Sequence, residues 1–167
     1  MIQVYTGDGK GKTTAALGLA LRAAGAGLKV YIAQFLKCGD FSELKALKKI
    51  KNIKVEQFGC RGFIRRTPAI KDKKLAVCGL KKVRELLVKG NYQLVILDEI
   101  NAAIKLKLLD LSDVVYLLKQ VNKKTEVVLT GRNAHAEILK IADLVSEIRE
   151  RKHYYKKGLK ARKGFEF

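Results

Sequence analysis

Short, continuously apolar runs recur along the chain, and most are separated by longer segments whose apolar residues follow helical spacing. This alternation predicts an α/β fold around a mainly parallel sheet, because parallel strands need a crossover connection, which is usually a helix. The runs do not alternate with polar residues, so we expect strands that are covered on both faces. The predicted strands are Ile2–Tyr5, Val30–Phe35, Ile53–Phe58, Leu94–Leu97, Val127–Leu129 and Leu144–Ile148.

Helices are predicted between these strands, and several end at Gly, Lys or Asn, as C-terminal signals suggest. The predicted helices are Lys12–Ala26, Phe41–Lys49, Lys73–Lys89, Ser112–Gln120 and Ala136–Ile141. Two basic stretches, Gly59–Lys71 and Arg151–Phe167, fit neither pattern and are interpreted as loops, which often carry function. With no linker or repeat, residues 1–167 are predicted to form one domain.

Composition narrows the class of protein. Hydrophobic residues make up 48% of the chain, enough to build a core and to exclude a wholly disordered protein. The 35 Lys and Arg exceed the 16 Asp and Glu by 19, which predicts an anionic partner: nucleic acid, an anionic membrane, a polyphosphate or an acidic protein. Three cysteines without a C-x-x-C pair indicate a reduced, cytoplasmic protein. No signal peptide or membrane-length apolar stretch is expected.

A glycine-rich loop between the first predicted strand and helix is the most specific motif, Thr6-Gly7-Asp8-Gly9-Lys10-Gly11-Lys12-Thr13-Thr14. Its glycines let backbone N–H groups surround phosphate oxygens, Lys12 adds a positive charge, and the Thr13 hydroxyl can bind Mg²⁺. The following helix adds the positive end of its dipole. Thr6 replaces the first glycine of the standard P-loop, so Gly7 and Gly9 are expected to supply the flexibility.

Two carboxylates, Asp98 and Glu99, follow the apolar run Leu94–Leu97. Downstream of a P-loop, this pattern is typical of the Walker B element that positions a metal, so either carboxylate is a candidate ligand. If Glu99 instead polarised a water molecule, the protein would be a hydrolase.

The expected nucleotide is ATP. Asn122-Lys123-Lys124-Thr125 resembles the guanine-reading motif but lacks its carboxylate, and Asn101 stands where a GTPase switch would need Gly. We interpret the lysine run as a solvated helix end.

Several motifs together resemble the P-loop corrinoid adenosyltransferases, the ATP:cob(I)alamin or cob(I)yrinic acid a,c-diamide type, over nearly the whole chain. Besides the P-loop, the matching segments are Gln34-Phe-Leu-Lys37, Leu97-Asp-Glu-Ile-Asn101, Thr130-Gly-Arg132, Ala142-Asp-Leu-Val-Ser-Glu147 and Lys152-His153 with Gly158-Leu-Lys-Ala161 and Gly164-Phe-Glu-Phe167. The resemblance implies a three-layer, RecA-like P-loop fold with a six-stranded sheet.

The resemblance also implies a reaction, in which the Co(I) centre of a reduced corrinoid attacks C5′ of ATP and releases triphosphate. ATP and the corrinoid are the implied substrates, with Mg²⁺ or Mn²⁺ as cofactor, a homodimer as the expected assembly and an acidic, flavodoxin-like protein as the reductant. Family members bind ATP reversed relative to P-loop hydrolases, which exposes C5′.

The resemblance assigns roles to particular residues. Lys12, Thr13 and Glu99 are the implied catalytic residues, and Thr13, Asp98 and Glu99 the implied metal ligands. The residues expected around the substrates are Gly7, Asp8, Gly9, Lys10, Gly11, Lys12, Thr13, Thr14, Phe63 and Arg132. Arg132 can contact phosphate or corrinoid amides, or simply pair with a carboxylate. His153 can approach the corrinoid or cap the last strand.

Two features depart from the family pattern. Family members commonly place G-F-x-W against the lower corrinoid face, whereas Gly62-Phe63-Ile64-Arg65 has Arg at the Trp position. Longer members also have an N-terminal extension over the corrinoid site, while this chain begins at its first strand, so we expect a more open site or a different lid.

A second hypothesis is a RecA-like ATPase that binds nucleic acid. Residues 45–74 hold 11 basic and two acidic residues, a density suited to a phosphate backbone. However, aromatic residues make up only 7% of the chain and are not interleaved with the basic residues as stacking platforms would be. We therefore interpret most of the charge as a solvated lysine surface.

Overall fold

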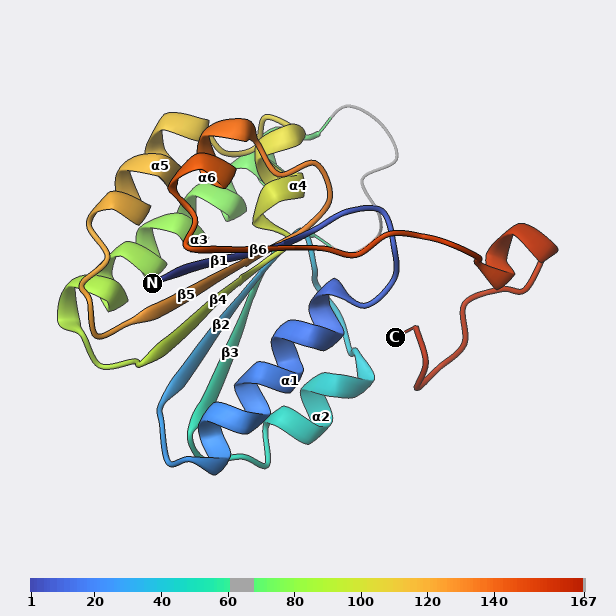
Figure 1. Ribbon diagram of the computed structural model, residues 1–167, viewed down its shortest axis with the longest axis horizontal. Coiled ribbons are helices and arrows are strands. Elements are labelled where there is room, and N and C mark those ends of the chain that lie inside the picture. Colours follow the sequence, from blue (N-terminus) through green and yellow to red (C-terminus); the bar gives the residue numbers. More distant parts are fainter. Residues whose placement is uncertain (61–67, 167) are drawn as a thin grey trace.

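The computed structural model describes residues 1–60 and 68–166 as three layers, with helices on both faces of a six-stranded sheet (Figure 1). The sheet order is β3-β2-β4-β5-β1-β6, and every neighbouring pair is parallel. The strands are β1 Ile2–Thr6, β2 Val30–Phe35, β3 Ile53–Phe58, β4 Leu94–Asp98, β5 Glu126–Thr130 and β6 Leu144–Glu147. This arrangement confirms the predicted RecA-like α/β class.

Helices α1 and α2 cover one face of the sheet, and α3, α4, α5 and α6 cover the other (Figure 1). Their bounds are α1 Lys12–Gly25, α2 Ser42–Leu47, α3 Ile70–Lys89, α4 Ile100–Lys105, α5 Leu111–Lys119 and α6 Ala136–Ile141, followed by the 3₁₀ helix η1 Tyr154–Lys157. The chain therefore crosses back over the sheet between successive strands.

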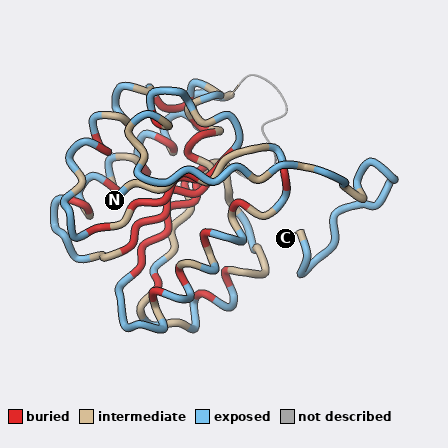
Figure 2. The backbone as a smooth tube through the Cα atoms, in the orientation of Figure 1, coloured by how far each residue is buried: buried red, intermediate tan, exposed pale blue. Residues whose placement is uncertain are grey.

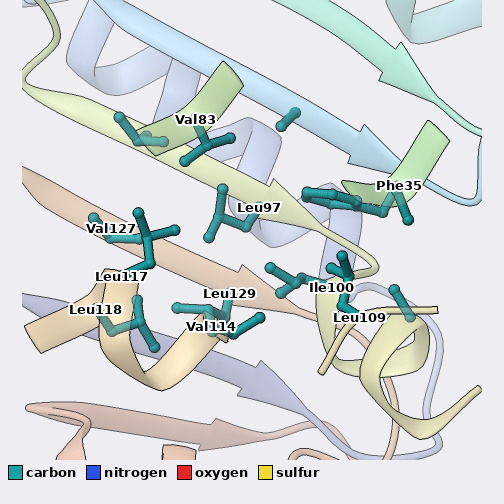
Figure 3. Close-up of a cluster of buried hydrophobic side chains, with 14 of the residues drawn as sticks. Phe35, Val83, Leu97, Ile100, Leu109, Val114, Leu117, Leu118, Val127 and Leu129 are labelled. Carbon is teal, nitrogen blue, oxygen red and sulfur yellow. The ribbon is translucent and has the colours of Figure 1, made fainter. Parts of the chain in front are cut away.

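The central strands carry the core, because their side chains alternate between two hydrophobic clusters. Val95 and Leu97 face the cluster under α3 to α6, whereas Leu94 and Ile96 face the one under α1 and α2. Every residue of β2 and β4 is buried, as the red centre of Figure 2 shows. Figure 3 shows Leu97 among the side chains of the first cluster.

Three sequence predictions about the elements were wrong. β6 is not covered on both faces: all four of its residues are exposed, because it is an edge strand that pairs only with β1. Helix α3 begins at Ile70 instead of Lys73, since Asp72 accepts a hydrogen bond from the backbone N of Ala69 (2.9 Å) and closes its first turn. Short helix α4 was missed; only Glu99 separates it from the end of β4.

The sheet order positions the candidate site residues. Parallel strands end at a common edge, so the segments after β1, β2, β4 and β5 meet there. Because β5 lies between β1 and β4, the P-loop and the Asp98-Glu99 pair are separated by one strand. In the described part of the chain, no helix has the length and apolar character needed to cross a membrane.

Candidate functional site

The P-loop lies against the end of the edge strand. The backbone N of Gly9 donates to the carbonyl of Ile148 (2.7 Å). A Cβ at Gly7 or Gly9 would lie 2.5 Å or 2.8 Å from that oxygen, closer than real side chains approach. Gly7 also has a φ of 96°, which favours glycine. These glycines are therefore required by close packing against residue 148, in addition to loop flexibility.

The side chain of Lys12 folds back against the P-loop. Its side chain is buried, and Nζ donates to the carbonyl of Gly9 (2.7 Å). Burial lowers the pKa of the Lys12 ammonium, and the charge of Arg132 lowers it further. The Lys12 ammonium thus donates to a neutral carbonyl oxygen, whereas a bound triphosphate would offer it anionic oxygens.

Asp98 is the centre of the polar network at the sheet edge, and its side chain is only 1% exposed. Its Oδ1 accepts from the hydroxyls of Thr13 (2.8 Å) and Thr130 (2.7 Å). Its Oδ2 accepts from Nζ of Lys37 (2.8 Å) and Nε2 of Gln34 (3.3 Å). The donors come from α1, β5, β2 and the loop after β2, so the carboxylate joins four separate segments of the chain.

Glu99 sits in a strained turn between β4 and α4. Its φ of 62° is rare for a residue with a side chain, and its backbone N donates to Oγ1 of Thr130 (3.0 Å). Burial raises the pKa of Glu99, and the charge of Asp98 adds to the shift, while nearby cations oppose it. In the described part of the chain, neither amide atom of buried Asn101 has a hydrogen-bond partner, which leaves capacity for a substrate or water.

Arg132 reaches from the turn after β5 to the P-loop. Its Nη2 donates to the carbonyl of Asp8 (3.2 Å), and its Nε lies 3.8 Å from Oδ1 of the same residue. Both side chains are exposed, so the pair is weak and open to a ligand. The carboxylate pairing considered for Arg132 is therefore present in the structure.

The chain segment after β6 returns to the P-loop (Figure 1). Nζ of Lys10 donates to the hydroxyl of Tyr154 (2.7 Å) and to Oε1 of Glu166 (2.9 Å), and the Tyr154 hydroxyl also hydrogen-bonds Glu166. The backbone N of Arg162 donates to Oε2 of Glu166 (2.6 Å). We call residues 151–166 the tail. It contacts the P-loop through Lys10.

Comparison with known proteins assigns the chain to a family. The model of the family described as "ATP:corrinoid adenosyltransferase BtuR/CobO/CobP" matches residues 1–167. The chain belongs to this family. It is 36% identical over 171 residues to a corrinoid adenosyltransferase of Sinorhizobium sp., a match that covers 100% of this chain and 80% of the relative.

Two further relatives cover the chain equally well. The corrinoid adenosyltransferase of Escherichia coli K12 is 35% identical over 169 residues, covering 100% of this chain and 85% of its own. The corrinoid adenosyltransferase of Pseudomonas aeruginosa is 34% identical over 170 residues, a match that covers 100% of this chain and 83% of the relative.

The oxygen donors of this family member suit a hard divalent cation. The hydroxyl of Thr13 and the carboxylate of Asp98 are hydrogen-bonded at the sheet edge, and Glu99 follows Asp98 in the chain. Mg²⁺ is usually bound by one or two carboxylates together with substrate phosphates. Within residues 1–60 and 68–166 there is no cluster of three or more His, Cys, Asp and Glu side chains suited to a metal. The donor set therefore fits a metal that arrives with phosphate.

The remaining predicted residues lie at the start of α1, in the tail, or outside the described part of the chain. Gly11 precedes α1 with a φ of 122°, and Thr14 is exposed in its first turn. His153 caps η1 instead of the last strand, because its Nδ1 accepts from the backbone N of Tyr155 (3.1 Å). Phe63 and Arg65 lie outside the described residues, so the expectations about the lower corrinoid face stay predictions.

Sequence reasoning gave no site role to Gln34, Lys37, Thr130, Tyr154 or Glu166. One signal was present for Gln34, a polar residue inside the otherwise apolar run of β2. Gln34 accepts from Nε2 of Gln57 on β3 (3.1 Å), which extends the network across the sheet.

Proposed function

We propose that the protein transfers the 5′-deoxyadenosyl group of ATP to the Co(I) centre of a reduced corrinoid and releases triphosphate. The observation that carries the proposal is the full-length family match on a chain whose P-loop, Thr13 and Asp98 are assembled at one sheet edge. The roles of individual residues are part of the same proposal.

In this reaction the cobalt centre supplies both electrons of the new Co–C5′ bond. The C5′–O5′ bond breaks, and its electron pair leaves with the triphosphate. Negative charge therefore grows on the leaving group, and stabilising that charge is the protein's main task. The corrinoid supplies the nucleophile, so no protein side chain has to attack.

Lys12 is suited to stabilise the departing triphosphate. Its ammonium already lies within the P-loop, where it donates to a neutral carbonyl, and it would exchange that contact for phosphate oxygens. The N-terminus of α1 points its free N–H groups and positive dipole at the same place.

Thr13, Asp98 and Glu99 would hold the divalent cation, which would neutralise phosphate charge when bound. Asp98 fixes the orientation of the Thr13 hydroxyl in advance through their 2.8 Å hydrogen bond. Glu99 needs no role as a base, because the reaction activates no water. For the attack to occur, the phosphates must lie in the loop while C5′ faces outward to the corrinoid.

The remaining partners belong to the same proposal. An acidic, flavodoxin-like electron-transfer protein would supply Co(I), for which a chain of net charge +19 is electrostatically suited. A homodimer stays an expectation from the family, and a cytoplasmic location stays an expectation from the three cysteines. The nucleic-acid-binding ATPase is not favoured, since the family match accounts for the P-loop and the acidic pair together.

The test is anaerobic incubation with ATP, Mg²⁺ or Mn²⁺ and chemically reduced cobalamin, while the visible spectrum is followed for adenosylcobalamin. We expect product with the wild-type chain and none with Lys12→Ala. Lys48→Ala, which removes an exposed lysine of the segment after α2, is the matched control and should retain activity. Absence of product, together with salt-sensitive binding of single-stranded DNA, would reject the proposal in favour of the ATPase.

A further inference from the structure

The loop after β2 places a lysine at the metal-binding side of the site. Nζ of Lys37 lies 2.8 Å from Oδ2 of Asp98 and 3.4 Å from Oγ1 of Thr13, and its side chain is only 19% exposed. A hydroxyl of the P-loop and a carboxylate after a buried strand are the protein ligands that P-loop sites offer to a divalent cation. A positive charge of the protein therefore contacts both of these oxygen ligands.

The backbone around Lys37 is built to hold it there. Leu36 has a φ of 61°, a left-handed conformation that is unfavourable for a residue with a side chain. A Cβ at Gly59, after β3, would lie 2.5 Å from the carbonyl carbon of Leu36 and from the backbone N of Lys37. The turn is thus both strained and tightly packed, and strain of this kind clusters at functional sites.

Asp98 has no acceptor position left in this arrangement. An ionised carboxylate offers about four lone-pair positions, and Asp98 accepts four hydrogen bonds. A cation that binds Asp98 directly must replace one donor. Of the four, only Lys37 is charged, so only Lys37 opposes the cation by electrostatic repulsion as well as by occupying its place.

We propose that Lys37 occupies the cation position in the nucleotide-free protein and leaves it when the divalent cation enters with a nucleoside triphosphate. The triphosphate supplies the anionic acceptors that the displaced ammonium needs, so the metal binds together with the nucleotide and binds poorly alone. This inference rests on the proposed function only for the statement that a triphosphate binds at the P-loop.

Titration of the nucleotide-free protein with Mn²⁺ alone, followed by the electron paramagnetic resonance of free Mn²⁺, tests the proposal. Lys37→Met keeps the length of the side chain without its charge, and we expect it to bind Mn²⁺ about tenfold tighter or more than the wild-type chain. Lys54→Met is the matched control, since Lys54 also pairs with a carboxylate, that of Glu56 (2.7 Å), but on β3. Its Mn²⁺ affinity should equal that of the wild type.

If the Lys37→Met variant does not fold, the same titration is made with Lys37→Gln, because its uncharged amide can still donate a hydrogen bond to Asp98. An Mn²⁺ affinity that stays the same or falls in the folded variant overturns the proposal and makes Lys37 a structural partner of Asp98. The titration contains neither ATP nor corrinoid. Its result is therefore independent of the result of the adenosyl-transfer assay.

Discussion

Lys10 of the P-loop and Glu166 near the C-terminal end form an ion pair of 2.9 Å, although 156 positions separate them in the chain. The hydroxyl of Tyr154 contacts both side chains, so the three residues form one cluster. Tyr154 and Lys10 together hold the pKa of Glu166 below its usual range. The tail is thereby attached to the loop that we propose binds triphosphate.

Glu166→Gln should loosen this attachment, because it removes the charge that Lys10 and the backbone N of Arg162 contact. We expect trypsin to cut within residues 151–163 about two- to fivefold faster than in the wild type, since exposed ion pairs are individually weak. Glu137→Gln, the same exchange at an exposed position of α6, should leave the cutting rate unchanged. Equal rates for both variants would show that the contact does not hold the tail.

Gly9→Ala should destabilise the fold, because its new methyl group would lie 2.8 Å from the carbonyl oxygen of Ile148. Overpacking of this kind typically costs about 1–3 kcal/mol. Gly18→Ala inside α1 is the matched control, since a Cβ there meets nothing within 4 Å and the variant should be about 0.5–1 kcal/mol more stable. Urea denaturation measures both; a stable Gly9→Ala variant would contradict the close packing.

Asp98→Asn should be strongly destabilising even without substrates. It leaves the ammonium of Lys37 without its counter-charge in a largely buried place, and breaking a buried pair in this way costs about 3–5 kcal/mol. Asp110→Asn at the exposed start of α5 should change stability by less than about 0.5 kcal/mol. Thermal denaturation compares the two. A small effect at Asp98 would mean that its hydrogen bonds are not maintained in solution.

The raised pKa of Glu99 predicts how stability depends on pH. Between the ordinary pKa of 4.5 and the raised value, the unfolded chain binds fewer protons than the native one, so Glu99 lowers stability as pH rises through that window. Glu99→Gln removes this penalty, and its stability relative to wild type should therefore increase with pH above 4.5. Urea denaturation across the acidic range measures the difference, with Glu137→Gln as the baseline for a carboxyl-to-amide exchange. A difference that stays constant or decreases would show that burial does not raise this pKa.

The sequence predicted those parts of the fold that depend on local patterns. The apolar runs placed all six strands within about one residue of their bounds, because a buried strand needs an uninterrupted apolar run. Helix α4 escaped prediction, since only Glu99 separates it from β4 and no loop signal marks where it begins. The exposure of β6 was also missed, because position in the sheet, and not residue type, decides which strand is at the edge.

The sequence by itself determined the P-loop motif, the acidic pair and the family, because these are recognised from runs of adjacent residues, without reference to distant contacts. Only the tertiary structure decided which residues surround them. Parallel strands bring the ends of β2, β4 and β5 to one edge, where Lys37 and Thr130 reach Asp98. The closure of the tail on Lys10 likewise comes from folding, since no local rule relates residues 156 positions apart.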